Sequence, residues 1–143
     1  MQDSSGTTSF SYDLLGRTAS ETKTVNGTPY TFNRSYDALS RLKTLTYPDG
    51  ETVTYTYNGL GDVETVTGEI PGAAPISYVT NVDYNASGQI TRLQYGNGVA
   101  TDYTYNPNTL RLSSLLTRNS ALAMTPPPKL KPLKGRGRQQ KSA

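Results

Sequence analysis

Aspartates are the most regularly placed reactive side chains of this 143-residue chain, at Asp13, Asp37, Asp49, Asp62, Asp83 and Asp102. Paired carboxylates can act as general acids and bases, and clustered carboxylates bind calcium. Most of these aspartates instead stand at offsets typical of turns, where an Asp side chain accepts a hydrogen bond from the backbone two residues on. We therefore interpret them as turn residues and expect no catalytic carboxylate pair and no metal site.

The composition excludes the commonest catalytic side chains. The chain has no histidine and no cysteine, which removes the usual general base, thiolate nucleophiles and disulfides. Serine and lysine are present, but no spacing brings them into a nucleophile–base pair. No glycine-rich loop precedes a helix, so a phosphate cradle is not indicated. We expect a protein that is not an enzyme and that binds no cofactor.

Tyrosine is the dominant aromatic residue, with 11 copies against two phenylalanines and no tryptophan. Rows of exposed aromatic rings can stack on sugars or bases. The same rings can also pack as cross-strand pairs, and a half-wet sheet suits tyrosine because its apolar ring carries a polar tip. We favour packing. A carbohydrate- or cell-surface-binding module that displays its tyrosines remains the alternative.

The tyrosines are positioned by strands. In Thr52–Tyr57, Val53, Tyr55 and Tyr57 alternate with three threonines, so one face is apolar and the other carries hydroxyls. Alternating β-branched and aromatic residues favour a β-strand over a helix. Asp49-Gly50 and Asn97-Gly98 stand between such runs, where glycine supplies the positive φ of a tight hairpin turn.

The pattern repeats along the chain. Tyr36 to Tyr57 and Tyr84 to Tyr105 each span 21 residues and share a leading turn of the form Tyr-Asp/Asn-x-x-Gly. Further copies of this turn start at Tyr12, Tyr57 and Tyr105. We predict that each unit is a β-hairpin, that the chain forms about ten strands, and that Gly61 and Gly88 adopt left-handed backbone conformations.

These residues resemble a known family. The stretch Tyr12-Asp13-Leu14-Leu15-Gly16-Arg17 is similar to the YD repeat of bacterial Rhs proteins, Tc toxin B/C components and teneurins, and the resemblance covers about residues 7–118. The matching motif positions are Tyr12, Asp13, Gly16, Arg17, Tyr36, Asp37, Arg41, Tyr57, Asn58, Gly61, Tyr84, Asn85, Gly88, Tyr105 and Asn106. Ser40 replaces a glycine, Asp62 and Gln89 replace arginines, and the fifth copy is one residue longer.

The resemblance implies an all-β fold, an array of antiparallel β-hairpins that forms part of a shell wall. In Rhs and Tc proteins such a shell encloses a C-terminal toxic domain, and in teneurins it belongs to an adhesion ectodomain. The chain is thus expected to be a non-catalytic fragment of a shell. Its partners would be the remainder of the shell or further copies of itself, and the parent family is typically secreted or at the cell surface.

The ends of the chain differ from the repeats. We expect a flexible N-terminus over residues 1–6, repeats over 7–118, and a disordered, Pro-rich, basic tail over 119–143, which holds six Lys/Arg and no acid. Residues 1–118 therefore carry a net charge of −3, and the basic character belongs to the tail. We expect a solvated tail and no nucleic-acid partner, with binding of the tail to nucleic acid or an anionic surface as the alternative. Neither a signal peptide nor an 18-residue apolar run is found in the sequence.

Overall fold

The computed structural model describes residues 2–3 and 6–119, and its strands form one antiparallel sheet in chain order from β1 to β11. The strands are β1 Gln2–Asp3, β2 Gly6–Tyr12, β3 Thr18–Val25, β4 Thr28–Tyr36, β5 Leu42–Thr46, β6 Thr52–Tyr57, β7 Val63–Glu69, β8 Ile76–Tyr84, β9 Ile90–Tyr95, β10 Val99–Tyr105 and β11 Leu112–Asn119. No helix occurs in these residues. The predicted all-β hairpin array is confirmed.

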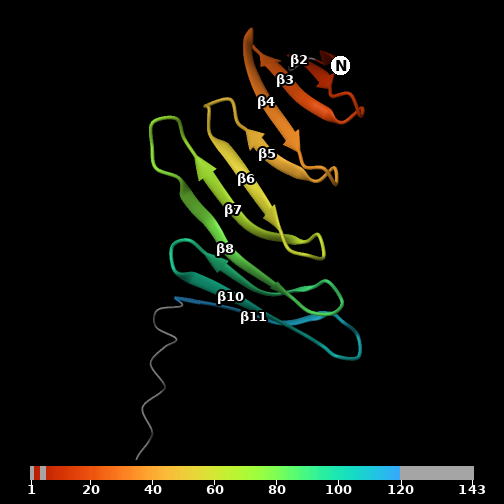
Figure 1. Ribbon diagram of the computed structural model, residues 1–143, viewed down its shortest axis with the longest axis vertical. Helices are drawn as coiled ribbons and strands as arrows, with labels where there is room; N and C mark the ends of the chain where they lie inside the picture. Colours follow the sequence, from red (N-terminus) through yellow and green to blue (C-terminus); the bar gives the residue numbers. More distant parts are fainter. Residues whose placement is uncertain (1, 4–5, 120–143) are drawn as a thin grey trace, which may run out of the picture.

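Consecutive hairpins place the turns in two rows, one at each end of the strands (Figure 1). The turns that follow the leading tyrosines, at residues 13–17, 37–41, 58–62, 85–89 and 106–111, lie along one edge, at the right of Figure 1. We call them the tyrosine turns. The remaining turns, including Asn26-Gly27 and Asp49-Gly50, lie at the opposite ends of the strands, and we call this row of turns the tip edge.

The two faces of the sheet differ in chemistry, as the alternation in Thr52–Tyr57 predicts. Tyr55 lies directly opposite Val66 on one face, and the neighbouring Thr56 lies opposite Thr65 on the other. Threonine and serine hydroxyls pair across strands on this second face, for example Thr56–Thr65 at 2.6 Å, Thr46–Thr52 at 3.0 Å, Thr22–Thr31 at 2.9 Å and Ser11–Ser20 at 2.7 Å. An aromatic and aliphatic face therefore backs a hydroxyl face.

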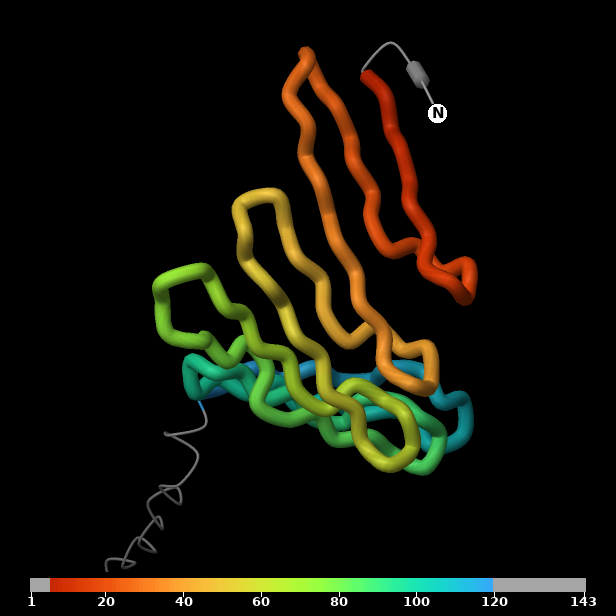
Figure 2. Tube along the Cα trace, turned by 45° about the horizontal axis from the view of Figure 1, so that its top comes forward, coloured from red at the N-terminus to blue at the C-terminus, as the bar shows by residue number. Residues whose placement is uncertain are grey.

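The buried core is small because the described residues form a single layer. Only Val53, Val82 and Ala100 are buried apolar residues, together with the hydroxyl-bearing Thr101. The sheet twists strongly, so that its last strands turn away from the direction of its first strands (Figure 2). Large apolar residues remain exposed along the whole array, including Phe10, Leu14 and Leu115.

The strand count exceeds the sequence estimate by one, because Gln2 and Asp3 form the short β1 against Gly6 and Thr7. The proline- and glycine-rich stretch after Glu69 connects β7 to β8 without regular structure, as expected for a hairpin insertion. The predicted tail lies outside the described residues, apart from Asn119 at the end of β11. Its disorder, the N-terminal flexibility and the region boundaries stay predictions.

Candidate functional site

The candidate site is the row of tyrosine turns. The first turn shows which hydrogen bonds close each of them. Asp13 Oδ1 accepts hydrogen bonds from the N–H groups of Leu15 at 2.9 Å and Arg17 at 3.0 Å. The N–H of Gly16 donates to the carbonyl of Asp13 at 3.0 Å, and Gly16 has a φ of 77°. One short acceptor side chain and one left-handed residue thus reverse the chain in five residues.

Three further turns repeat this geometry. Asp37, Asn58 and Asn85 each accept from the N–H groups two and four residues on, at 2.9–3.0 Å. In the longer fifth turn, Asn106 accepts from Asn108 and Thr109, and Leu110 takes the left-handed position with a φ of 56°. The extra residue is accommodated without losing the side-chain acceptor.

The predicted left-handed glycines are confirmed. Gly61 has a φ of 95° and Gly88 a φ of 73°. Ser40, which replaces the glycine of the second turn, adopts the same conformation with a φ of 62°. The second turn therefore keeps its shape with a serine, at the steric cost that a left-handed residue with a Cβ carries.

The leading tyrosines bond each unit to the one before it. Their hydroxyls donate to the carbonyl of the first residue of the strand that follows the previous tyrosine turn: Tyr36 to Thr18 at 2.9 Å, Tyr57 to Leu42 at 2.6 Å, Tyr84 to Val63 at 2.8 Å and Tyr105 to Ile90 at 2.8 Å. We call these four bonds the tyrosine ladder. All four tyrosines are half-buried. Tyr57 and Tyr105 are therefore packed and bonded, as predicted, rather than displayed.

Two arginines reinforce the ladder, a role that the sequence reasoning missed. Arg17 pairs with Asp13 of its own turn, Nε to Oδ2 at 2.7 Å, and its guanidinium lies 4.5 Å from the ring centroid of Tyr36 in the next unit. Arg41 pairs with Asp37 at 2.7 Å and lies 4.2 Å from the ring of Tyr57. Each arginine therefore links its turn to the next tyrosine by a cation–π contact.

The last residue of a turn also reaches the following turn. Arg17 Nη1 donates to Ser40 Oγ at 3.0 Å, and Gln89 Nε2 donates to the carbonyl of Leu110 at 2.8 Å. Ser40 and Leu110 are the left-handed residues of their own turns. The recurrence of arginine five residues after Tyr12 and Tyr36 was the available sequence signal, although it could not show which residue the side chain contacts.

The negative charges of Asp13 and Asp37 are stabilised by hydrogen bonds within their own turns. Desolvation raises the pKa of Asp13, but hydrogen bonds from the Arg17 backbone and side chain and from Leu15 outweigh it, so the pKa is lowered. The Arg41 backbone N–H is the main cause of the lowered pKa of Asp37, with desolvation opposing it. These bonds go to the charged form and therefore favour it.

The third turn lacks an arginine, and its tyrosine differs accordingly. Asp62 stands where Arg17 and Arg41 stand in their turns. Desolvation raises the pKa of the Tyr84 hydroxyl, and the negative charge of Asp62 raises it further. This step of the ladder therefore keeps the hydroxyl bond to Val63 without a cation over the ring.

A groove on the tip edge is lined by aromatic rings. It has a volume of about 530 Å³ and is lined by Pro29, Tyr30, Phe32, Tyr47, Pro48 and Asp49. Phe32 and Tyr47 meet edge to face with their centroids 5.7 Å apart, and Tyr30 is 45% exposed. These rings take no part in the tyrosine ladder.

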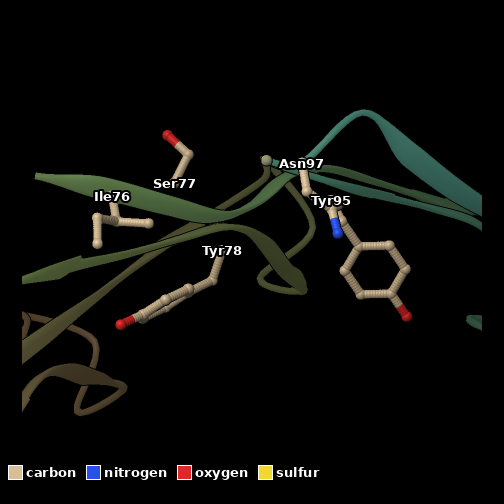
Figure 3. A pocket seen from close by; sticks show the side chains of 6 residues that line it. Ile76, Ser77, Tyr78, Tyr95 and Asn97 are labelled. Atoms are coloured by element: carbon tan, nitrogen blue, oxygen red, sulfur yellow. The ribbon is translucent and has the colours of Figure 1, made fainter. Parts of the chain in front are cut away.

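A second hollow of about 350 Å³ lies where β8 meets the β9–β10 turn (Figure 3). The rings of Tyr78 and Tyr95 extend to one side of the backbone there, while Ser77 points to the other. Tyr78 crosses β7 above Gly68 to bond Glu51, and this bond is the main cause of its raised pKa. A Cβ on Gly68 would overlap the Tyr78 ring, so glycine is needed for this crossing.

The arrangement holds successive units of the chain in register. Among the described residues, no three potential metal ligands gather in one place. The same part of the chain contains no helix long and apolar enough to cross a membrane. Asp13, Asp37, Asn58, Asn85 and Asn106 each cap a turn, so the motif residues carry out a structural task within the edge.

Comparisons with known proteins agree with this geometry. The family model described as RHS Repeat matches residues 36–69. The sheet is similar to a crystal structure of TcdB2–TccC3, with a TM-score of 0.77 and 25% identity over 83% of this chain. It is also similar to the Photorhabdus luminescens Tc holotoxin pore, with a TM-score of 0.76 and 26% identity over 83%. The chain covers only 7% and 6% of those chains, and it matches no curated protein.

Proposed function

We propose that the chain is a length of non-catalytic wall in an Rhs-type shell. Its match to the RHS Repeat family model over residues 36–69 and the similarity of its sheet to TcdB2–TccC3 support this role. Its partner is the remainder of such a shell. The tyrosine ladder is the observation that carries this proposal, because it bonds each unit to its predecessor at four successive steps. A structure stabilised between neighbouring units suits a wall that is extended one unit at a time.

The openness of the sheet supports the same role. Only Val53, Val82 and Ala100 form an apolar core among the described residues, while large apolar side chains such as Leu115 and Phe10 are about half exposed. A wall segment gains cover for such side chains from the turns of the shell that lie before and after it. By resemblance to Rhs and Tc proteins, the enclosed cargo is a C-terminal toxic polypeptide.

A chimera tests this role. Residues 6–119 would replace the matched stretch of TcdB2–TccC3, and the purified particle would be examined by electron microscopy and by protease digestion. We expect a closed shell that protects its enclosed segment. The matched control carries Tyr57→Ala and Tyr84→Ala in the same graft, which removes two steps of the ladder and lowers the yield of closed shells. A folded graft that leaves the enclosed segment exposed to protease contradicts the proposal.

The groove on the tip edge favours one second candidate, a carbohydrate-binding surface. Tyr30, Phe32 and Tyr47 offer ring faces that can stack on a sugar, and the carboxylate of Asp49 can accept hydrogen bonds from its hydroxyls. A glycan-array screen of the full chain tests it, with Tyr47→Ala as the comparison. Binding that is lost in this variant supports the second candidate, and no binding above background rejects it.

A further inference from the structure

The last strand that the structure describes, β11, lies at the edge of the sheet. Within the described residues it pairs only with β10, and all eight of its residues are exposed. Leu112, Leu115 and Leu116 are 52–56% exposed. From Leu112 to Arg118 its outer side therefore has no strand partner among the described residues, and its leucines are exposed, which is the combination that templates pairing with another strand.

The usual protections of an edge strand are missing here. Soluble proteins place lysine, proline or an inward-pointing charge on an exposed edge to prevent such pairing. β11 contains neither lysine nor proline, and Arg118 is its one charged residue. That charge is held by Asp102 of β10, Nη2 to Oδ2 at 2.6 Å, and so is compensated within the chain.

We propose that β11 pairs with β11 of a second copy of this chain, antiparallel, with Leu115 opposite its own copy. This pairing rests on the proposed function, in which β11 is the edge strand of a length of shell wall. A two-fold axis perpendicular to the sheet is the one that relates two adjacent antiparallel copies of a strand, and it keeps each face on its own side. The result is a continuous sheet that runs through both copies.

The register follows from the faces and from the charge. Leu115 lies directly opposite Tyr103 on the apolar face, so a central Leu115 pair extends that face across the junction. The same register places the two copies of Arg118 at opposite ends of the junction, each near the β-bulge between Leu112 and Ser114 of the other copy. The two arginines therefore stay apart, and no like charges meet across the strands. These two features make a second copy a suitable partner for this edge.

Cysteine cross-linking tests the register directly, because the chain has no cysteine of its own. Directly opposite residues have Cβ atoms about 4.5–5.5 Å apart, close to the spacing of a disulfide. We expect Leu115→Cys to form a disulfide-linked dimer under mild oxidation, faster than Leu116→Cys. The matched control is Leu14→Cys, a fully exposed leucine in the first tyrosine turn. Cross-linking of Leu115→Cys no faster than that of Leu14→Cys overturns the proposal.

Light scattering coupled to size-exclusion chromatography measures the association itself. The full chain should show a mass that rises from monomer to dimer with concentration, and Leu115→Lys should shift the midpoint at least tenfold higher. Leu14→Lys should leave it unchanged, and circular dichroism confirms that both variants remain β-sheet. Equal midpoints for the two variants overturn this interface. The shell role would stand or fall separately, because the chimera buries β11 within one chain.

Discussion

At the scale of residues, the tyrosine hydroxyl explains why the leading position holds tyrosine and not phenylalanine. The ring contributes apolar surface to a half-buried site, and the hydroxyl satisfies a strand carbonyl of the preceding unit, as in Tyr57 to Leu42 and Tyr84 to Val63. A buried carbonyl left without a donor costs free energy. Phenylalanine would keep the packing but remove the hydroxyl donor from that carbonyl.

Substitution of Tyr57 separates these two contributions. Tyr57→Phe removes the bond to Leu42 and should lower the free energy of unfolding by about 0.5–1.5 kcal/mol. Tyr57→Ala should cost more, although less than the ~3–5 kcal/mol of a fully buried aromatic, because Tyr57 is half-buried. Urea denaturation followed by circular dichroism measures both changes.

The control for this pair is Tyr12→Phe, since Tyr12 is 62% exposed and precedes the first ladder bond. It should leave the denaturation midpoint nearly unchanged. If Tyr57→Phe also leaves the midpoint unchanged, the ladder bonds do not stabilise the sheet.

The pH dependence of stability follows from Asp13 and Asp37. Both pKa values are lowered in the folded protein below the ordinary value of an aspartate, by hydrogen bonds that outweigh desolvation. The ionised carboxylates therefore stabilise the fold above pH 4, and this contribution is lost as the pH falls through the folded values. We expect the unfolding midpoint to decrease on acidification from about pH 5 to about pH 2.

The double variant Asp13→Asn, Asp37→Asn checks the source of that decrease. Asparagine already caps the turns at Asn58 and Asn85, so the variant should keep the turn while losing the charge. Its midpoint should depend less on pH over the same range. An acid dependence as steep as that of the unmodified chain would show that other groups cause it.

At the scale of elements, the strands and turns could be predicted because their signals are local. The alternation of Val53, Tyr55 and Tyr57 and the glycines Gly61 and Gly88 act within a few residues of themselves. The ladder and the arginine contacts could not be derived in the same way, since they join residues 15 to 23 positions apart. Their partners depend on which strands become neighbours.

The missing arginine of the third turn gives a prediction at this scale. In Asp62→Arg the guanidinium should lie over Tyr84, as Arg41 lies over Tyr57, and should replace a negative charge that raises the Tyr84 pKa. We expect stabilisation of about 0.5–1 kcal/mol, the size of an exposed cation–π contact. Thermal unfolding measures it.

The reverse change, Arg41→Asp, is the matched control for Asp62→Arg. It removes the cation from Tyr57 and places two carboxylates in one turn, at Asp37 and at the new residue, so it should destabilise the sheet. A midpoint that falls in Asp62→Arg would mean that the turns are not equivalent.

At the scale of the molecule, the described sheet is a single layer with a few buried residues, and neighbouring units provide much of its stability. The repeat and the hairpin topology could be read from the chain, because spacing records them. An exposed terminal strand over Leu112–Leu116 and self-association could be inferred too, because the repeats end there. The groove of Tyr30 and Tyr47 could not, because its lining residues come from different strands and turns. In such an array each unit adds its own stability and one interface.

The most direct measurement of the wall account is therefore the urea unfolding midpoint as the number of repeats changes. One variant duplicates the 21-residue unit 36–56 in tandem, and another deletes it. Both variants should fold, with a higher midpoint after duplication and a lower one after deletion. If duplication abolishes the fold or leaves the midpoint unchanged, the chain is a closed domain with a fixed number of strands and not a length of shell wall.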